Sequence, residues 1–221
     1  MTRSNVARGF FALTALCVVA GLVIQIPLTA RSTDGFFDSP AARVANLFAF
    51  FTILSNLLVG ATCLQLALHP DTDSTVFRVI RLAGVVQIFV TGVVYWIALS
   101  DLVEYGKWES IANQLVHSVV PVLGVIGWFA FGPRGRLSMR VVALSTIVPV
   151  AWLAFTLIRG PIAHWYPYPF LDVDQHGYPK VLVNVVIVAL LYLALAMAAL
   201  GLDRKLPGAT PQAAGSQTNG Q

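Results

Sequence analysis

VLVNVVIVALLYLALAMAALGL, residues 181–202, is an uncharged apolar stretch that can cross a lipid bilayer as a single helix. The hydrocarbon core of a bilayer requires about 20 residues of α-helix. Five other stretches have a comparable length and composition, so the sequence predicts an all-α, six-helix transmembrane bundle. We expect the six helices at residues 9–30, 45–68, 79–100, 111–131, 139–158 and 181–202.

The composition supports the same fold class. The chain has 221 residues, of which 57% are hydrophobic and 11% charged, with a mean hydropathy of +0.76. These values exclude an ordinary soluble domain and indicate a polytopic membrane protein. The net charge of +4 is spread over short loops, with no basic run typical of nucleic-acid binding. The first apolar stretch exceeds the about 15 residues of a signal-peptide core, so we interpret it as a retained helix.

The loop charges predict the orientation of the bundle. If both termini lie on one side, that side carries nine Lys and Arg residues and the other side carries five. The positive-inside rule then predicts cytoplasmic termini and a multi-pass protein of the cell membrane. Residues 1–206 form the membrane domain, and the polar tail 207–221 is expected to be disordered. The nine residues are Arg3, Arg8, Arg78, Arg81, Arg134, Arg136, Arg140, Arg204 and Lys205.

His117 is the only histidine inside a predicted span. An ionisable group in a membrane is costly, which makes it a candidate functional residue. Asn113 lies one helical turn before it and Pro121 one turn after it. Because proline has no N–H, the carbonyl of His117 loses its helical partner and a kink is predicted there. The alternatives are a structural histidine that bonds across the bundle and a proton relay, although no carboxylate lies in the predicted spans to continue a relay.

A second polar group lies in FFTILSN, residues 50–56, where Thr52, Ser55 and Asn56 share one helical face. Thr52 is about seven residues into its predicted helix and His117 about six, so a rise of 1.5 Å per residue gives both the same depth. The alternative interpretation is that Thr, Ser and Asn bond the helices to one another. Gln87 in the third span is open to the same two interpretations.

A hydroxyl beside an imidazole is typical of nucleophilic catalysis, because histidine can remove the hydroxyl proton near neutral pH. Asn113 is the candidate for orienting the ring, since the spans contain no acid to do so. Asn56 and Asn113 are candidate donors to an oxyanion. The aromatic, proline-rich loop at 161–179 is either an interfacial belt or a lid over the site. Its His and Asp residues match no compact metal motif, and neither a metal nor a cofactor is expected.

Three stretches resemble a known family: FFTILSN, NQLVHSVVP at 113–121, and WYPYPFLD at 165–172. In their order and spacing they resemble the bacterial Pr-six-Pr membrane proteins, relatives of the androgen-induced and androgen-dependent TFPI-regulating protein family of intramembrane threonine hydrolases. The resemblance covers about residues 9–202. It implies hydrolysis of fatty acid esters of hydroxy fatty acids, with Thr52 as nucleophile and His117 as base. The chain departs from the family's pattern at Gln114, where a second histidine is expected.

The leading hypothesis is therefore a membrane hydrolase of lipid esters with a Thr52–His117 dyad. Ser55, Asn56, Asn113 and Gln87 are the candidate substrate-binding or orienting residues. A non-enzymatic scaffold or regulator is the first alternative, and it predicts that Thr52 and His117 face different neighbours. A small transporter is the second, and it requires a polar path toward the opposite side of the membrane. The distance between the two side chains separates the hydrolase from the scaffold.

Overall fold

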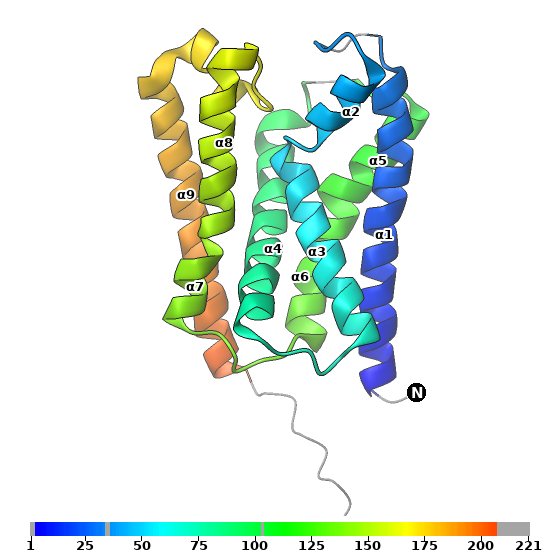
Figure 1. Cartoon of the computed structure of the whole chain (residues 1–221). Helices are drawn as coiled ribbons and strands as arrows, with labels where there is room; N and C mark the ends of the chain where they lie inside the picture. Colours follow the sequence, from blue (N-terminus) through cyan, green and yellow to red (C-terminus); the bar gives the residue numbers. More distant parts are fainter. Residues whose placement is uncertain (1–2, 34–35, 103, 207–221) are drawn as a thin grey trace, which may run out of the picture.

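The computed structural model describes residues 3–33, 36–102 and 104–206, and all regular structure in these ranges is helical. Six helices are long and apolar enough to cross a membrane, which confirms the predicted six-span architecture (Figure 1). The predicted disordered tail, 207–221, lies outside the described residues. The six spans are Ser4–Arg31, Phe51–Leu68, Thr75–Leu99, Lys107–Phe131, Met139–Ala163 and Val173–Lys205.

Three of these spans are composed of two or more helical segments. In chain order the helices are α1 Arg3–Arg31, α2 Pro40–Leu47, α3 Phe51–Leu68, α4 Thr75–Val94, the π-helical η1 Tyr95–Leu99, α5 Lys107–Gln114, the π-helical η2 Leu115–Val119, α6 Val120–Phe131, α7 Met139–Ser145, α8 Ile147–Ala163, the 3₁₀-helical η3 Pro169–Leu171 and α9 Val173–Lys205. The last of them contains a non-helical residue, Gly177. The two π-helical segments lie beside the candidate site.

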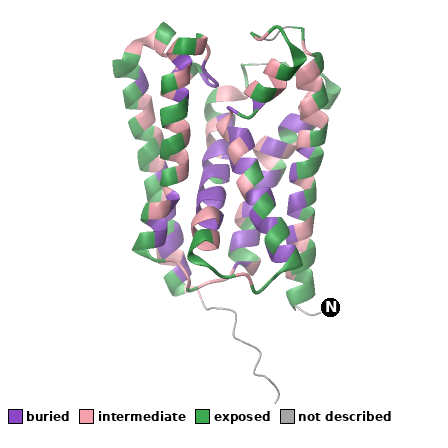
Figure 2. Ribbon diagram, in the orientation of Figure 1, coloured by how far each residue is buried: buried purple, intermediate pink, exposed green. Residues whose placement is uncertain are grey.

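The helix α4 occupies the centre of the bundle. It contacts α3, α6, α7 and α9, and α1 packs against α3 on the far side. In the most apolar 18 residues of the span that contains α4, 61% of the residues are buried. In the corresponding stretches of the α7–α8 span and of α9, only 22% are buried (Figure 2). The pair α8 and α9 therefore exposes most of its apolar surface, as expected for helices that face lipid.

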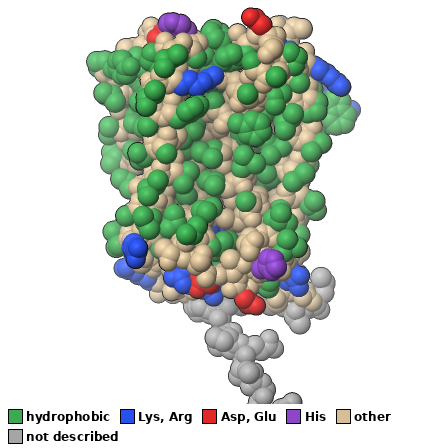
Figure 3. Space-filling model, in the orientation of Figure 1, with side chains coloured by type: hydrophobic (Ala, Val, Ile, Leu, Met, Phe, Trp, Pro, Cys, Tyr) green, Lys and Arg blue, Asp and Glu red, His purple; other side chains and the backbone are tan. Residues whose placement is uncertain are grey.

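The molecule has two ends, which we call the termini face and the loop face. Both described ends of the chain lie at the termini face, and α2 and η3 lie at the loop face (Figure 1). Charged side chains gather at the two faces, and an apolar belt separates them (Figure 3). The assignment of the termini face to the cytoplasm stays a prediction.

The predicted helix at 45–68 is wrong at its start. The structure divides it into α2 and α3, with a break at 48–50 where Phe50 is extended (φ −73°, ψ 132°). At the break the indole nitrogen of Trp152 donates to the carbonyl of Ala49 at 2.8 Å, which replaces a helical partner of that carbonyl. Thr52 is therefore the second residue of α3, rather than the seventh or eighth residue of a continuous helix.

The predicted span at 139–158 is divided at Thr146, between α7 and α8. Pro149 explains the break because it supplies no N–H to the carbonyl of Ser145. The hydroxyl of Tyr192 on α9 donates to that carbonyl instead, at 2.9 Å. The same bond joins the α7–α8 span to α9.

Arg81 corrects the count of loop charges. It lies inside α4 and is only 4% exposed, so it is a buried residue of a span. Its guanidinium donates to the Thr62 hydroxyl at 3.3 Å and to the Cys63 sulfur at 3.1 Å, and it covers the Phe11 ring at 5.2 Å. These contacts compensate part of the cost of burying the charge.

Candidate active site

The structure brings Thr52 and His117 together. Thr52 Oγ1 lies 3.2 Å from His117 Nε2, within hydrogen-bond distance, although 65 residues separate them in the chain. The scaffold alternative predicted different neighbours for the two side chains, whereas the two side chains are in contact. Thr52 is 5% exposed, and His117 is half-buried.

His117 lies in the π-helical turn η2. Here the N–H of Val120 donates to the carbonyl of Leu115, five residues back, where an α-helix bonds four residues back. Pro121 follows directly and leaves the carbonyl of His117 without its helical donor. The predicted irregularity at Pro121 is therefore confirmed, and it takes the form of a π turn. Gly92 of α4 allows close packing here, because a Cβ at that position would lie 3.1 Å from the Pro121 Cβ.

The neighbours of the His117 ring define its tautomer. Nδ1 lies 3.2 Å from the backbone carbonyl oxygen of Asn113. Since a carbonyl only accepts hydrogen bonds, Nδ1 carries the proton and Nε2 is free to accept the Thr52 hydroxyl proton. Asn113 orients the ring as predicted, but through its backbone rather than its side chain. The side-chain amide of Asn113 donates to the Tyr95 hydroxyl, and the Tyr95 ring stacks on His117 with centroids 4.1 Å apart.

Tyr168 is the third side chain at Thr52, and the sequence reasoning did not single it out. Its hydroxyl lies 3.2 Å from Thr52 Oγ1 and accepts the Thr52 backbone N–H at 3.1 Å. It comes from the loop between α8 and η3, 116 residues from Thr52. The only sequence signal was its place in WYPYPFLD, one of the three stretches that carry the family resemblance.

Ser55 and Asn56 support the backbone around Thr52. The Ser55 hydroxyl donates to the Thr52 carbonyl at 2.9 Å, and the Asn56 amide donates to the same carbonyl at 2.8 Å. The Asn56 amide also donates to the Val116 carbonyl at 3.1 Å, which joins α3 to η2. Both residues are fully buried, and Asn56 holds the two halves of the dyad together, whereas Ser55 joins α3 to Thr91 of α4. Both N–H groups of the Asn56 amide are therefore in use, and the Asn113 amide is directed at Tyr95.

Gln87 does not join this group. It is fully buried in α4, both polar atoms of its amide lack a partner, and it lines neither of the two large cavities around Thr52. The structure thus brings together Thr52, His117, Ser55, Asn56 and Asn113, and leaves Gln87 apart from them.

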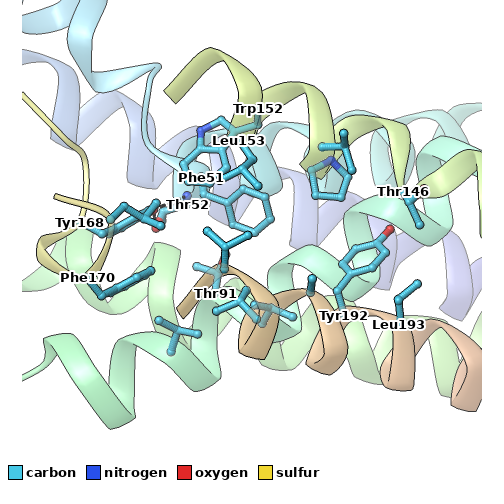
Figure 4. A pocket seen from close by; sticks show the side chains of 18 of the residues that line it. Phe51, Thr52, Thr91, Thr146, Trp152, Leu153, Tyr168, Phe170, Tyr192 and Leu193 are labelled. Atoms are coloured by element: carbon cyan, nitrogen blue, oxygen red, sulfur yellow. Dashed lines mark hydrogen bonds between the residues drawn. The ribbon is translucent and has the colours of Figure 1, made fainter. Parts of the chain in front are cut away.

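Two cavities meet at Thr52. The first, which we call the vestibule, has a volume of about 1000 Å³, and charged and amide side chains such as Arg43, Glu109 and Asn113 contribute to its wall. The second, which we call the apolar cavity, has about 350 Å³ and runs between α4, α8 and α9. Figure 4 shows the apolar cavity, with Thr52 and Tyr168 toward one end and Tyr192 toward the other.

Thr52, Leu99 and Tyr168 line both cavities. The dyad residue His117 lines the vestibule only. Thr52 therefore lies in the wall of both cavities, and the imidazole contacts it from the vestibule side.

The loop predicted as a lid or belt forms part of the vestibule wall. Trp165, Pro167, Tyr168 and Pro169 line the vestibule, whereas the Tyr166 ring packs on Gly160 of α8, where any side chain would clash with it. His164 forms an exposed contact of 3.3 Å with Asp174, away from the dyad. The loop thus contributes both to a wall and, through Tyr168, to the site itself.

No protein-family model, curated protein or solved structure matches the chain. The resemblance based on the three short stretches therefore stays a prediction.

Proposed function

We propose that the chain is an integral membrane hydrolase of lipid esters, located in the cell membrane with cytoplasmic termini. Thr52 is the nucleophile and His117 the general base. The observation that supports this proposal is the 3.2 Å contact between the Thr52 hydroxyl and an imidazole nitrogen that lacks a proton. Its position where an apolar and a polar cavity meet suits a substrate with one apolar and one polar part.

The first half of the reaction transfers the acyl group to the enzyme. Thr52 Oγ1 attacks the ester carbonyl carbon while its proton moves to His117 Nε2, and the carbonyl electron pair moves onto oxygen. When the tetrahedral intermediate collapses, the bond to the alcohol oxygen breaks and that oxygen takes the proton from His117. The products of this half are a free alcohol and an acyl ester on Thr52.

The second half uses water in the same way. His117 Nε2 takes a proton from a water molecule in the vestibule, and the resulting hydroxide attacks the acyl carbon. Collapse of the second intermediate returns the proton to Thr52 Oγ1 and releases a carboxylic acid. His117 can serve both halves because it lines the vestibule, from which water reaches the dyad.

The two cavities suggest how the substrate binds. The acyl chain lies in the apolar cavity, whose walls are almost entirely aliphatic and aromatic, and the alcohol part lies in the vestibule. Helices α8 and α9 expose apolar surface beside the apolar cavity, so a lipid can approach laterally from the bilayer. The family resemblance makes fatty acid esters of hydroxy fatty acids the first class to assay.

Labelling with a fluorophosphonate probe tests the nucleophile. Purified protein in lipid nanodiscs should be labelled, and T52A should lose both labelling and ester hydrolysis, the latter by about 10⁴-fold or more. T156A is the matched control, because Thr156 is equally buried on α8, its hydroxyl has no partner, and it lines neither large cavity. Undiminished labelling or hydrolysis in folded T52A would exclude Thr52 as the nucleophile.

A further inference from the structure

Hydrolysis by Thr52 creates a negative charge that needs a donor. In the tetrahedral intermediate the carbonyl oxygen becomes an oxyanion, which enzymes stabilise with donors placed about 2.7–3.1 Å away. The side-chain amides of Asn56 and Asn113 are already hydrogen-bonded to other groups. The donors next to Thr52 Oγ1 are the Thr52 backbone N–H, which is bonded to the Tyr168 oxygen, and the Tyr168 hydroxyl.

The hydrogen bonds around Thr52 have one consistent direction. The Asn113 carbonyl accepts from His117 Nδ1, and His117 Nε2 accepts from Thr52 Oγ1. The Tyr168 oxygen accepts the Thr52 N–H, so the hydroxyl hydrogen of Tyr168 is left to donate to Thr52 Oγ1. Each donor is used once, and the Tyr168 O–H points at the atom on which the intermediate forms.

We propose that Tyr168 is a further catalytic residue, whose hydroxyl donates a hydrogen bond to the oxyanion together with the Thr52 backbone N–H. The oxyanion is two bonds away from Oγ1, so a donor within 3.2 Å of Oγ1 reaches it by a small rotation. Thr52 N–H lies in the first turn of α3, where N–H groups have no helical partner and the helix dipole favours a negative charge. This inference rests on the proposed ester hydrolysis.

The surroundings of Tyr168 keep its hydroxyl in place and protonated. Prolines precede and follow it, at 167 and 169, which restricts the backbone, and Tyr168 is extended (φ −139°, ψ 139°). Its ring stacks on Phe170 with centroids 5.4 Å apart and meets the edge of Phe50 at 5.9 Å. Burial raises the pKa of Tyr168 above its ordinary value, so the hydroxyl remains a donor at neutral pH.

Y168F tests this role because it removes the hydroxyl and keeps the ring. We expect kcat for a long-chain ester to fall about 10²-fold, with little change in KM. Y166F is the matched control: Tyr166 is two residues away, its hydroxyl is buried without a partner, and it lines neither large cavity. That variant should retain the wild-type kcat.

Two ligands distinguish between two roles for Tyr168: a donor to the oxyanion, and a residue that only positions Thr52. A trifluoromethyl ketone with the same acyl chain forms a hemiketal oxyanion on Thr52, and the matching ether cannot react. Y168F should weaken binding of the ketone by the same factor by which it lowers kcat. The affinity for the ether should stay unchanged, and that result also demonstrates that the variant is folded. Unchanged kcat in Y168F, or a lower kcat with undiminished ketone affinity, would overturn the proposal.

The variants also distinguish this proposal from the proposed function. If T52A also hydrolyses the ester, the proposed function itself fails. If T52A is inactive and Y168F is fully active, only the role of Tyr168 fails.

Discussion

The vestibule and the apolar cavity share Thr52, Leu99 and Tyr168 but differ in how they are built. The apolar cavity lies between spans, and its wall consists mainly of side chains from α4, α8 and α9. The wall of the vestibule includes loop segments at the loop face, where polar bonds hold the chain. Arg43, for example, donates to two backbone carbonyls of the segment between α1 and α2 and to the carbonyl of Ala30 in the last turn of α1.

This difference separates the residues into two functional groups. In the proposed reaction, residues of one wall affect only the part of a substrate that the wall encloses, whereas Thr52, His117 and Tyr168 act on the bond between the two parts. Substitutions at the boundary should therefore reduce the turnover of every ester, and substitutions in a wall should change which ester is preferred or how stable that wall is.

After T52A, the largest effect is expected for H117A, at the boundary. Loss of the general base should reduce kcat/KM by about 10³-fold, and by the same factor for short-chain and long-chain esters. Hydrolysis of p-nitrophenyl esters of increasing chain length measures both quantities. H164A is the control, since His164 is an exposed histidine far from the dyad. A loss that depends strongly on chain length would place His117 in substrate binding instead of chemistry.

A189F should narrow the apolar cavity and change specificity. Ala189 lines this cavity from α9 and is itself exposed, so a larger side chain fits without disrupting buried packing. If the ring excludes three methylene groups, at about 0.8 kcal/mol each, long-chain esters should lose about 50-fold in kcat/KM. Acetyl esters should be unaffected. A194F, on the same helix and equally exposed but lining neither large cavity, should match the wild type for all chain lengths. An equal loss for acetyl esters would argue against acyl binding in this cavity.

R43A should destabilise the vestibule wall. The Arg43 guanidinium donates to the carbonyls of Phe37, Asp38 and Ala30 at 2.7–2.9 Å. Because the released carbonyls can reach water, we expect a loss of only about 1–2 kcal/mol of stability. A lower Tm in nanodiscs and faster hydrogen exchange over residues 36–47 measure it. R140A removes the same charge from Arg140, which is exposed and lines neither large cavity, and should change neither measurement. An unchanged Tm in R43A would show that the loop is held by other contacts.

Much of the fold could be predicted because membrane helices follow from length and hydropathy alone. All six spans were identified, and Pro121 indicated the irregular place beside His117 correctly. The errors occur where tertiary bonds compete with helical ones. The break before Phe51 depends on Trp152, which is a hundred residues away and donates to the Ala49 carbonyl.

The site could be predicted only in part, for the same reason. Thr52 and His117 were paired by their similar depth, which is a property of each helix separately. Tyr168 and Tyr95 contribute a hydroxyl and a stacked ring from other elements, and no spacing in the sequence connects them to the dyad. The orienting group of His117 is a backbone carbonyl, which every residue possesses, so residue type could not identify it.

The two π-helical turns have a consequence for how such a site can be inherited. Tyr95 begins η1 and His117 lies in η2, and their rings stack on each other. A π turn holds one more residue than the α-helical path through the same segment. Deleting one residue between His117 and Val120 would restore a regular helix and change the direction in which His117 points relative to α6. Every chemical group would still be present, yet the imidazole would no longer face Thr52. For a related chain to keep the proposed activity, the number of residues in this helix therefore matters as much as the presence of Thr52 and His117.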